Sequence, residues 1–193
     1  SLHDSFTARA SGHMICVIPS GPERLATLLR LIGEAQQSFH LLTYIFAADS
    51  CGIAVRDALT AAAQRGVEVA LLIDSFGSAT TNDDFFTPLR EAGGSARWLG
   101  TRWTPDYLIR NHQKLAIADG RIVMGGGFNI ADGYFAAADH LTAWQDLGFT
   151  ISGPAVSDMV AWFDDMQQWM DAPRPRFRDL RSMVARWRPR PGP

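Results

Sequence analysis

The chain has 193 residues, of which 47% are hydrophobic and 20% are charged, a composition typical of one globular domain with a substantial core. No run of apolar residues is long enough to span a bilayer, and no signal peptide is visible. Cys16 and Cys51, the two cysteines, show no ligand spacing to the histidines, so they indicate neither a disulfide framework nor a metal site.

The net charge of −2 hides an uneven distribution. Residues 172–193 hold seven arginines and one acidic residue, whereas the rest of the chain holds 11 basic and 19 acidic side chains. An acidic body is a poor partner for nucleic acid, because that affinity comes mainly from neutralised phosphates. We expect a domain at 1–171 whose acidic charge disfavours nucleic acid, followed by an Arg/Pro-rich linker or tail at 172–193.

The predicted elements alternate between strands and helices. Residues 1–13 carry no periodic pattern and are expected to form a loose or edge segment. In chain order, the remaining pattern predicts strands at 14–18, 38–47, 67–73, 96–99 and 147–151, and helices at 22–35, 53–64, 81–92 and 154–170. On the last helix, the residues expected to face inward are Val156, Val160, Phe163 and Trp169.

Residues 110–129 predict a hairpin of two short apolar strands. Asp119-Gly120 is a dipeptide that takes the positive φ angles of a tight turn. The hairpin adds antiparallel strands to an otherwise alternating pattern, so we expect an α/β fold with a mixed sheet and helices on both faces.

His112 and Lys114 share one face of the first hairpin strand, because side chains alternate with period two. A two-residue turn pairs Lys114 with Gly125 and His112 with Gly127. The glycines would then form a floor without side chains, where a ligand can approach the backbone closely. Asn129 would close the far end of this space.

Lys114 is the single lysine among the 18 basic residues. Every other basic position is Arg, and a compact ammonium is not equivalent to a planar guanidinium at close quarters. An imidazole, an ammonium and an amide around a bare floor suit an anionic tetrahedral group such as phosphate.

The order His112-x-Lys114, Asp119, then Gly126-Gly127-x-Asn129 resembles the HKD motif of the phospholipase D superfamily. The Gly-Gly-x-Asn ending is most similar to bacterial cardiolipin synthases, and the resemblance runs from about Ile15 to Trp169. It implies a phospholipase D-like fold with one HKD half, acting without a cofactor or metal.

The resemblance also implies roles for the motif residues. His112 would attack phosphorus and form a covalent phosphohistidine. Lys114 and Asn129, with Gly126 and Gly127, would bind the phosphate oxygens. Asp119 is interpreted as a turn residue that supports the catalytic site from a distance.

Two further site residues are expected near the motif. Trp144-Gln145-Asp146 resembles the family's Trp-x-Asp element, so Asp146 is expected to orient His112, with Asp132 and Asp139 as alternatives. Tyr44 either lines the pocket or is an ordinary core tyrosine. His3, His13 and His40 are scattered, and His140 is expected in a surface loop.

The family mechanism uses a second motif histidine as general acid, and this chain contains one His-x-Lys. Either two chains pair, or the chain is the N-terminal half of a two-motif enzyme, which the absent initiator Met and the tail favour. The expected function is phosphatidyl transfer or phospholipase D activity on phospholipids, in the cytoplasm at the inner membrane surface. A homodimeric endonuclease and an inert half serving as an interaction module are the alternatives.

Overall fold

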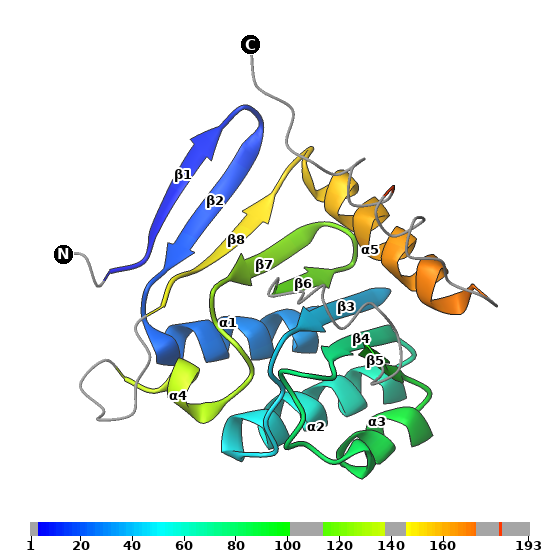
Figure 1. Ribbon diagram of the computed structural model, residues 1–193. Coiled ribbons are helices and arrows are strands. Elements are labelled where there is room, and N and C mark those ends of the chain that lie inside the picture. The colour runs from blue at the N-terminus through cyan, green and yellow to red at the C-terminus, as the bar shows by residue number, and fades with distance from the viewer. Residues whose placement is uncertain (1–3, 101–113, 138–145, 173–181, 183–193) are drawn as a thin grey trace.

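The computed structural model describes residues 4–100, 114–137, 146–172 and 182 (Figure 1). In this part of the chain, eight strands form one mixed sheet in the order β1-β2-β8-β7-β6-β3-β4-β5. The strands are β1 (Phe6–Ala10), β2 (His13–Ile18), β3 (Ser38–Thr43), β4 (Glu68–Asp74), β5 (Ser95–Leu99), β6 (Leu115–Ala118), β7 (Ile122–Gly126) and β8 (Gly148–Ser152). Strands β3, β4 and β5 are parallel, and the other neighbours are antiparallel.

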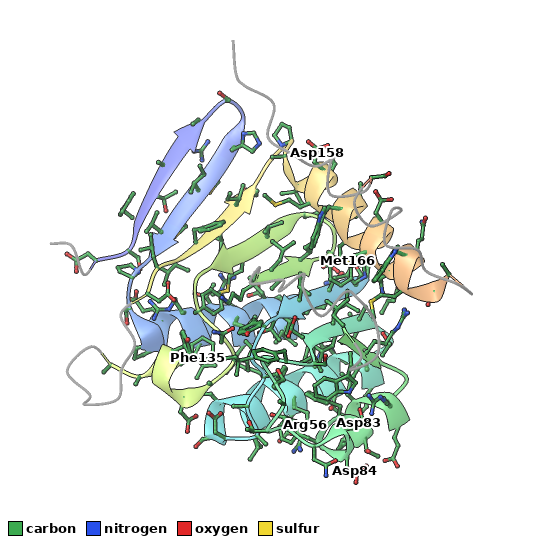
Figure 2. All side chains as sticks on the ribbon, viewed as in Figure 1. Arg56, Asp83, Asp84, Phe135, Asp158 and Met166 are labelled. Carbon is green, nitrogen blue, oxygen red and sulfur yellow. The ribbon has the colours of Figure 1, made fainter. Side chains whose placement is uncertain are left out.

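Helices cover both faces of the sheet, as the sequence predicts. The helices are α1 (Gly21–Glu34), α2 (Ser50–Gln64), the 3-10 helix η1 (Asp83–Phe86), α3 (Thr87–Glu91), α4 (Asp132–Phe135) and α5 (Val156–Asp171). Figure 1 shows α1 to α4 grouped on one side and α5 beside the β6–β7 hairpin. One core layer includes Phe135 of α4, and the other includes Met166 of α5, both labelled in Figure 2.

Side chains at the helix starts explain where α1 and α2 begin. Ser20 caps α1 by accepting from the Glu23 N–H at 3.5 Å, and Asp49 caps α2 by accepting from the Gly52 N–H at 2.9 Å. An oxygen at this position satisfies one of the backbone donors that a helix start leaves unpaired. No helix among the described residues is long and apolar enough to cross a membrane.

Several predicted boundaries are wrong. The strand expected at 38–47 ends at Thr43, and the helix expected at 81–92 divides into η1 and α3, with Pro88 in the first turn of α3. The edge segment expected within residues 1–13 is confirmed by the exposed strand at 6–10, whereas α4 was not anticipated. On α5, Val156 and Phe163 are buried as expected, but Met166 is buried and Trp169 is only partly so.

The Asp119-Gly120 turn is confirmed, whereas the predicted hairpin register is wrong. Asp119 and Gly120 have φ angles of 52° and 63°. However, Ala118 pairs with Ile122, so the turn contains three residues and Leu115 faces Gly125. Continued by one residue, this register places Lys114 opposite Gly126, not Gly125.

Candidate active site

Four candidate residues lie at the same end of the central strands, which form one edge of the sheet, because of the directions in which these strands run. Tyr44 follows β3 and Asn129 follows β7, while Lys114 precedes β6 and Asp146 precedes β8. Strands β3 and β7 run antiparallel to β6, and β8 runs antiparallel to β7. The carboxyl ends of the first pair therefore meet the amino ends of the second pair at the same edge.

Lys114 contacts the ring of Tyr44 at this edge. The Nζ atom lies 5.9 Å from the ring centroid, which is within cation–π range. Burial lowers the pKa of Lys114, and the negative charge of Asp146 opposes that shift. The Tyr44 ring thus lies beside Lys114, while its contact with a ligand stays a prediction.

The Asp146 carboxylate occupies the space that Gly127 leaves by having no side chain. A Cβ atom at Gly127 would collide with both carboxylate oxygens. The Leu147 N–H also donates to Oδ1 of Asp146 at 2.7 Å. Glycine is therefore needed at 127 to admit Asp146 close to the strand that carries the motif.

The predicted bare glycine floor is wrong, because β8 and the residue before it fill the space. The ring of Phe149 lies against Gly125, and the carbonyl of Leu147 lies against Gly126. Gly126 also has a φ of 144°, which side-chain-bearing residues rarely adopt. Ligand contact by Gly126 and Gly127 stays a prediction that concerns their backbones.

Asn129 joins β7 to the segment that follows β3. Its side chain is 3% exposed, and its Oδ1 accepts from the Ile45 N–H at 3.1 Å. The adjacent Ile130 exchanges backbone hydrogen bonds with this segment, accepting from Ala47 at 2.8 Å and donating to Ile45 at 2.9 Å. The orientation of the amide is therefore fixed, with the nitrogen directed away from Ile45.

Ser78 and Thr81 support the same segment, although no sequence motif singles them out. The Ser78 hydroxyl donates to the Tyr44 carbonyl at 3.0 Å and accepts from the Phe46 N–H at 2.9 Å. Thr81 donates to the Phe46 carbonyl at 2.6 Å. These two buried hydroxyls fix the backbone that presents Tyr44 to Lys114.

Asp119 lies at the opposite end of β6 from Lys114. Its carboxylate accepts from the backbone N–H groups of Gln36, Gln37 and Ser38, at 2.7 to 3.1 Å. Although burial opposes the shift, these donors lower the pKa of Asp119. The carboxylate ties the hairpin turn to the α1–β3 connection and lies apart from the residues at the open end.

Asp132, an alternative for orienting His112, is the first residue of α4, and its carboxylate lies against the start of α2. Its Oδ1 accepts from the Cys51 N–H at 2.7 Å, and its own N–H donates to Asp49 at 2.7 Å. Burial, followed by the hydrogen bond with Asp132, raises the pKa of the Cys51 thiol to about 12. The structure therefore gives Asp132 a capping role at α2.

Several predicted residues lie outside the described part of the chain, namely His112, Asp139, His140 and the Trp144-Gln145 dipeptide. Of the expected tail, Ala172 and Ser182 are described. Among the described residues, no group of three or more His, Cys, Asp or Glu side chains could hold a metal ion.

Other charged clusters serve the fold. Arg56, Asp83 and Asp84 lie together on the α2–α3 side of the molecule (Figure 2). Asp83 accepts from Arg90 at 2.7 Å and from the Trp98 indole at 2.6 Å. These bonds join η1, α3 and β5 without reaching the hairpin.

Sequence reasoning missed Arg24, a buried cation on α1. Its side chain is 1% exposed, and it donates to the carbonyl of Asp146 at 2.7 Å. The helical pattern predicted an apolar inner face and gave no signal for a buried charge, because the partners of Arg24 are backbone carbonyls, two of them 110 and 122 residues away.

The mixed sheet between two helical layers, with a lysine, an asparagine and an aspartate at one edge, defines a phospholipase D-like domain. The family model described as "Cardiolipin synthase, PLD-like domain" matches residues 28–167. The match covers more than half of the chain, so the chain belongs to this family.

Curated relatives agree with this assignment. The chain is 38% identical over 144 residues to "Major cardiolipin synthase ClsA" of Bacillus subtilis, covering 72% of this chain and 30% of the relative. It is 34% identical over 156 residues to a Listeria monocytogenes cardiolipin synthase, covering 79% of this chain and 32% of the relative. The chain thus spans about a third of the length of these relatives.

Solved structures share the fold. The phosphatidylserine synthase of Haemophilus influenzae superposes with a TM-score of 0.66 at 20% identity, covering 94% of this chain and 44% of that one. The phospholipase D family member Nuc from Salmonella typhimurium superposes with a TM-score of 0.56 at 22% identity, covering 79% and 91%. At these identities the likeness establishes the fold alone.

Proposed function

We propose that this chain is the His112-bearing half of a phosphatidyltransferase or phospholipase D-type enzyme that cleaves phosphodiester bonds of glycerophospholipids, as a cardiolipin synthase does. The observation that carries the proposal is the convergence of Lys114, Asn129 and Asp146 at one sheet edge. The single lysine of the chain is part of this cluster. The curated relatives named as cardiolipin synthases support the substrate class.

In this proposal, His112 is the nucleophile. An imidazole nitrogen forms a bond to phosphorus while the bond from phosphorus to the leaving alcohol oxygen breaks, which yields a phosphohistidine. An acceptor alcohol or water then attacks phosphorus and releases His112. The carboxylate of Asp146 orients the imidazole, in the manner of a base held by a third group.

Lys114 and Asn129 bind the non-bridging oxygens in the proposed reaction. The ammonium of Lys114 supplies a compact positive charge beside the Tyr44 ring. The Asn129 oxygen accepts from Ile45, so the amide nitrogen is the atom that would donate to phosphate. Donors fixed in advance stabilise the charge that develops in the transition state at no cost of reorganisation.

The leaving alcohol needs a proton, which a second histidine would supply as general acid. That group would come from a second HKD half, either in the same polypeptide or in a partner copy. We also propose a peripheral position at the inner face of the membrane, where the phospholipid substrate lies. A homodimeric endonuclease is the second candidate, because the chain has a single His-x-Lys motif.

The test compares two substrates with the whole protein. Phosphatidylglycerol in mixed micelles should be converted with release of an alcohol, and single-stranded DNA should be left intact. Intact-mass analysis after rapid quenching should show a phosphorylated species that is absent in His112→Ala. Cleavage of DNA alone would establish the endonuclease alternative, and no adduct with either substrate would establish an inert half.

Metal independence is part of the same proposal. Activity should persist in excess EDTA, because the ammonium and amide occupy the place of a cation in metal-assisted phosphoryl transfer. Loss of activity that one divalent ion restores would contradict this mechanism.

A further inference from the structure

Arg24 is a buried cation whose partners are almost all backbone carbonyls. Its side chain is 1% exposed. One terminal nitrogen donates to the carbonyls of Pro19 and Asp146, and the other donates to the carbonyl of Tyr134 at 2.8 Å. Its Nε has no partner among the described residues.

A buried guanidinium is a costly way to fill a helix–sheet contact. Desolvation of a charge is repaid only by well-placed partners, and an apolar side chain of similar volume would often be more stable. Burial lowers the pKa of Arg24, and the charge of Asp146 opposes that shift. The cost of burying Arg24 therefore indicates that this residue has a role other than stabilising the fold.

The carbonyl partners of Arg24 come from three segments that lead to the site. Pro19 lies between β2 and α1, Tyr134 lies in α4 after Asn129, and Asp146 lies two residues before the start of β8. Asp146 is also the residue whose carboxylate fills the space at Gly127. The guanidinium presents its donors in a rigid planar fork, whereas the three donors of a lysine all lie on one freely rotating nitrogen.

The absence of a side chain at Gly148 leaves room for the side chain of Arg24. A Cβ atom at Gly148 would lie 2.7 Å from Cδ of Arg24. Cδ lies in the middle of a buried side chain that is fixed at its far end, so it has little freedom to move away. Gly148 begins β8, two residues after Asp146, and its missing side chain lets the guanidinium reach the Asp146 carbonyl.

We propose that Arg24 is a positioning residue for Asp146: it holds the backbone carbonyl of Asp146 so that the carboxylate stands at Gly127. This inference rests on the proposed function, in which Asp146 orients His112. Arg24 acts through Asp146 and does not touch substrate.

The first experiment tests whether Arg24 holds the backbone at Asp146, and it does not depend on enzyme activity. Hydrogen–deuterium exchange should quicken at the Leu147 amide in Arg24→Lys and in Gly148→Ala. The matched control is Arg65→Lys, since Arg65 also donates to three carbonyls of the α1 region, those of Ile32, Gly33 and Ala35, at 3.0 to 3.3 Å. Unchanged exchange at Leu147 in Arg24→Lys would overturn the proposal.

The second experiment is a double-mutant cycle on turnover of phosphatidylglycerol. Arg24→Lys should lower kcat about 10- to 100-fold, because small misplacements of catalytic groups have effects of that size. It should leave KM within about twofold, and Arg65→Lys should change neither. Adding Arg24→Lys to Asp146→Asn should produce almost no further loss, because both changes remove one function.

Losses that multiply in the double variant would overturn the positioning role and leave Arg24 as a structural residue. Failure of the proposed function has a different signature. A protein inactive on phosphatidylglycerol, or one with normal kcat in Asp146→Asn, would refute the catalytic assignment, while the exchange data would still decide whether Arg24 holds Asp146.

Discussion

One aspartate lies near each end of the β6–β7 hairpin, and the two carboxylates have different surroundings. At the turn, Asp119 accepts from three consecutive backbone N–H groups, 81 to 83 residues away in sequence. At the open end, Asp146 lies against Gly127, with its charge acting on Lys114. The oxygens of Asp119 are bonded to the backbone, whereas the carboxylate of Asp146 lies near the half-buried ammonium of Lys114.

This difference shows how the partners of a carboxylate can indicate whether its role is structural or chemical. A carboxylate bound by several backbone donors has its lone pairs directed at the fold. A carboxylate admitted by a missing side chain, next to a cation at a sheet edge, can act on a ligand or on a neighbouring imidazole. We therefore expect substitutions at the open end to change turnover and substitutions at the turn to change stability.

The largest expected effect is at His112, two residues before Lys114 in the sequence. His112→Ala should lower kcat by at least about a thousandfold, since a covalent catalyst loses its attacking group. The measurement is turnover of phosphatidylglycerol, with the thermal midpoint recorded in parallel to exclude unfolding. Retention of more than about a thousandth of the activity would remove His112 from the nucleophile role.

Lys114→Arg should have the next largest effect. The guanidinium is wider than the ammonium and needs two acceptors side by side. The ligand proposed for this site is one compact phosphate group. We expect a barrier increase of about 2–4 kcal/mol, as for the loss of a well-placed oxyanion donor. The readout is kcat at saturating substrate.

Arg121→Lys is the matched control for this substitution, because it makes the reverse exchange at the exposed closed end of the same hairpin. It should leave kcat unchanged. If Lys114→Arg also turns over normally, the site needs only a positive charge, and the argument from the single lysine would be incorrect.

The sequence predicted the class of fold because local signals sufficed for it. Alternating apolar runs and helical spacing marked most elements, and the turn residues Asp119 and Gly120 have the positive φ angles expected of them. The register failed because the turn includes Arg121, so Ala118 pairs with Ile122. One added turn residue changes every partner along a hairpin.

The site could be predicted only in part, because some of its supports act over long sequence distances. The Lys114–Asn129–Asp146 set came from a motif, and the structure places these residues at one edge. Arg24 is 122 residues from Asp146, and its partners are carbonyls, which every residue carries. No local pattern can therefore identify it.

Asp119→Asn should show the effect expected of the turn. Losing charge-assisted bonds to Gln36, Gln37 and Ser38 should cost about 1–2 kcal/mol of unfolding free energy, or about 3–6 °C in Tm. Turnover per folded molecule should change little. Asp146→Asn serves as the reciprocal control, with lost turnover and a nearly unchanged Tm.

The pH dependence sharpens this contrast. The pKa of Asp119 is lowered in the folded state, so its contribution to stability is present above the unfolded pKa of about 4 and is lost as pH falls through the folded pKa. The difference in unfolding free energy between wild type and Asp119→Asn should therefore shrink below pH about 4. A difference that stays constant with pH would mean that the carboxylate charge contributes nothing at the turn.

The smallest effect is expected away from both ends of the hairpin, at His40 under helix α5. Its ring stacks on Phe163 with centroids 4.7 Å apart, and its buried Nε2 has no partner among the described residues. Burial lowers the pKa of His40, while the charges of Glu68 on β4 and Asp164 on α5 oppose the shift. The folded state therefore favours the neutral ring.

Because the pKa of His40 is lower in the folded state, the unfolded chain binds this proton first as pH falls below about 6.5. Stability should then decline towards acid by at most about 1.4 kcal/mol per pH unit from this group. His40→Leu removes the proton-binding ring at similar volume, so its unfolding free energy should decline less between pH 7.5 and 5.5. Urea unfolding at both pH values measures the two slopes. Equal slopes would mean that His40 takes up its proton equally well in the folded state, with Glu68 and Asp164 cancelling the effect of burial.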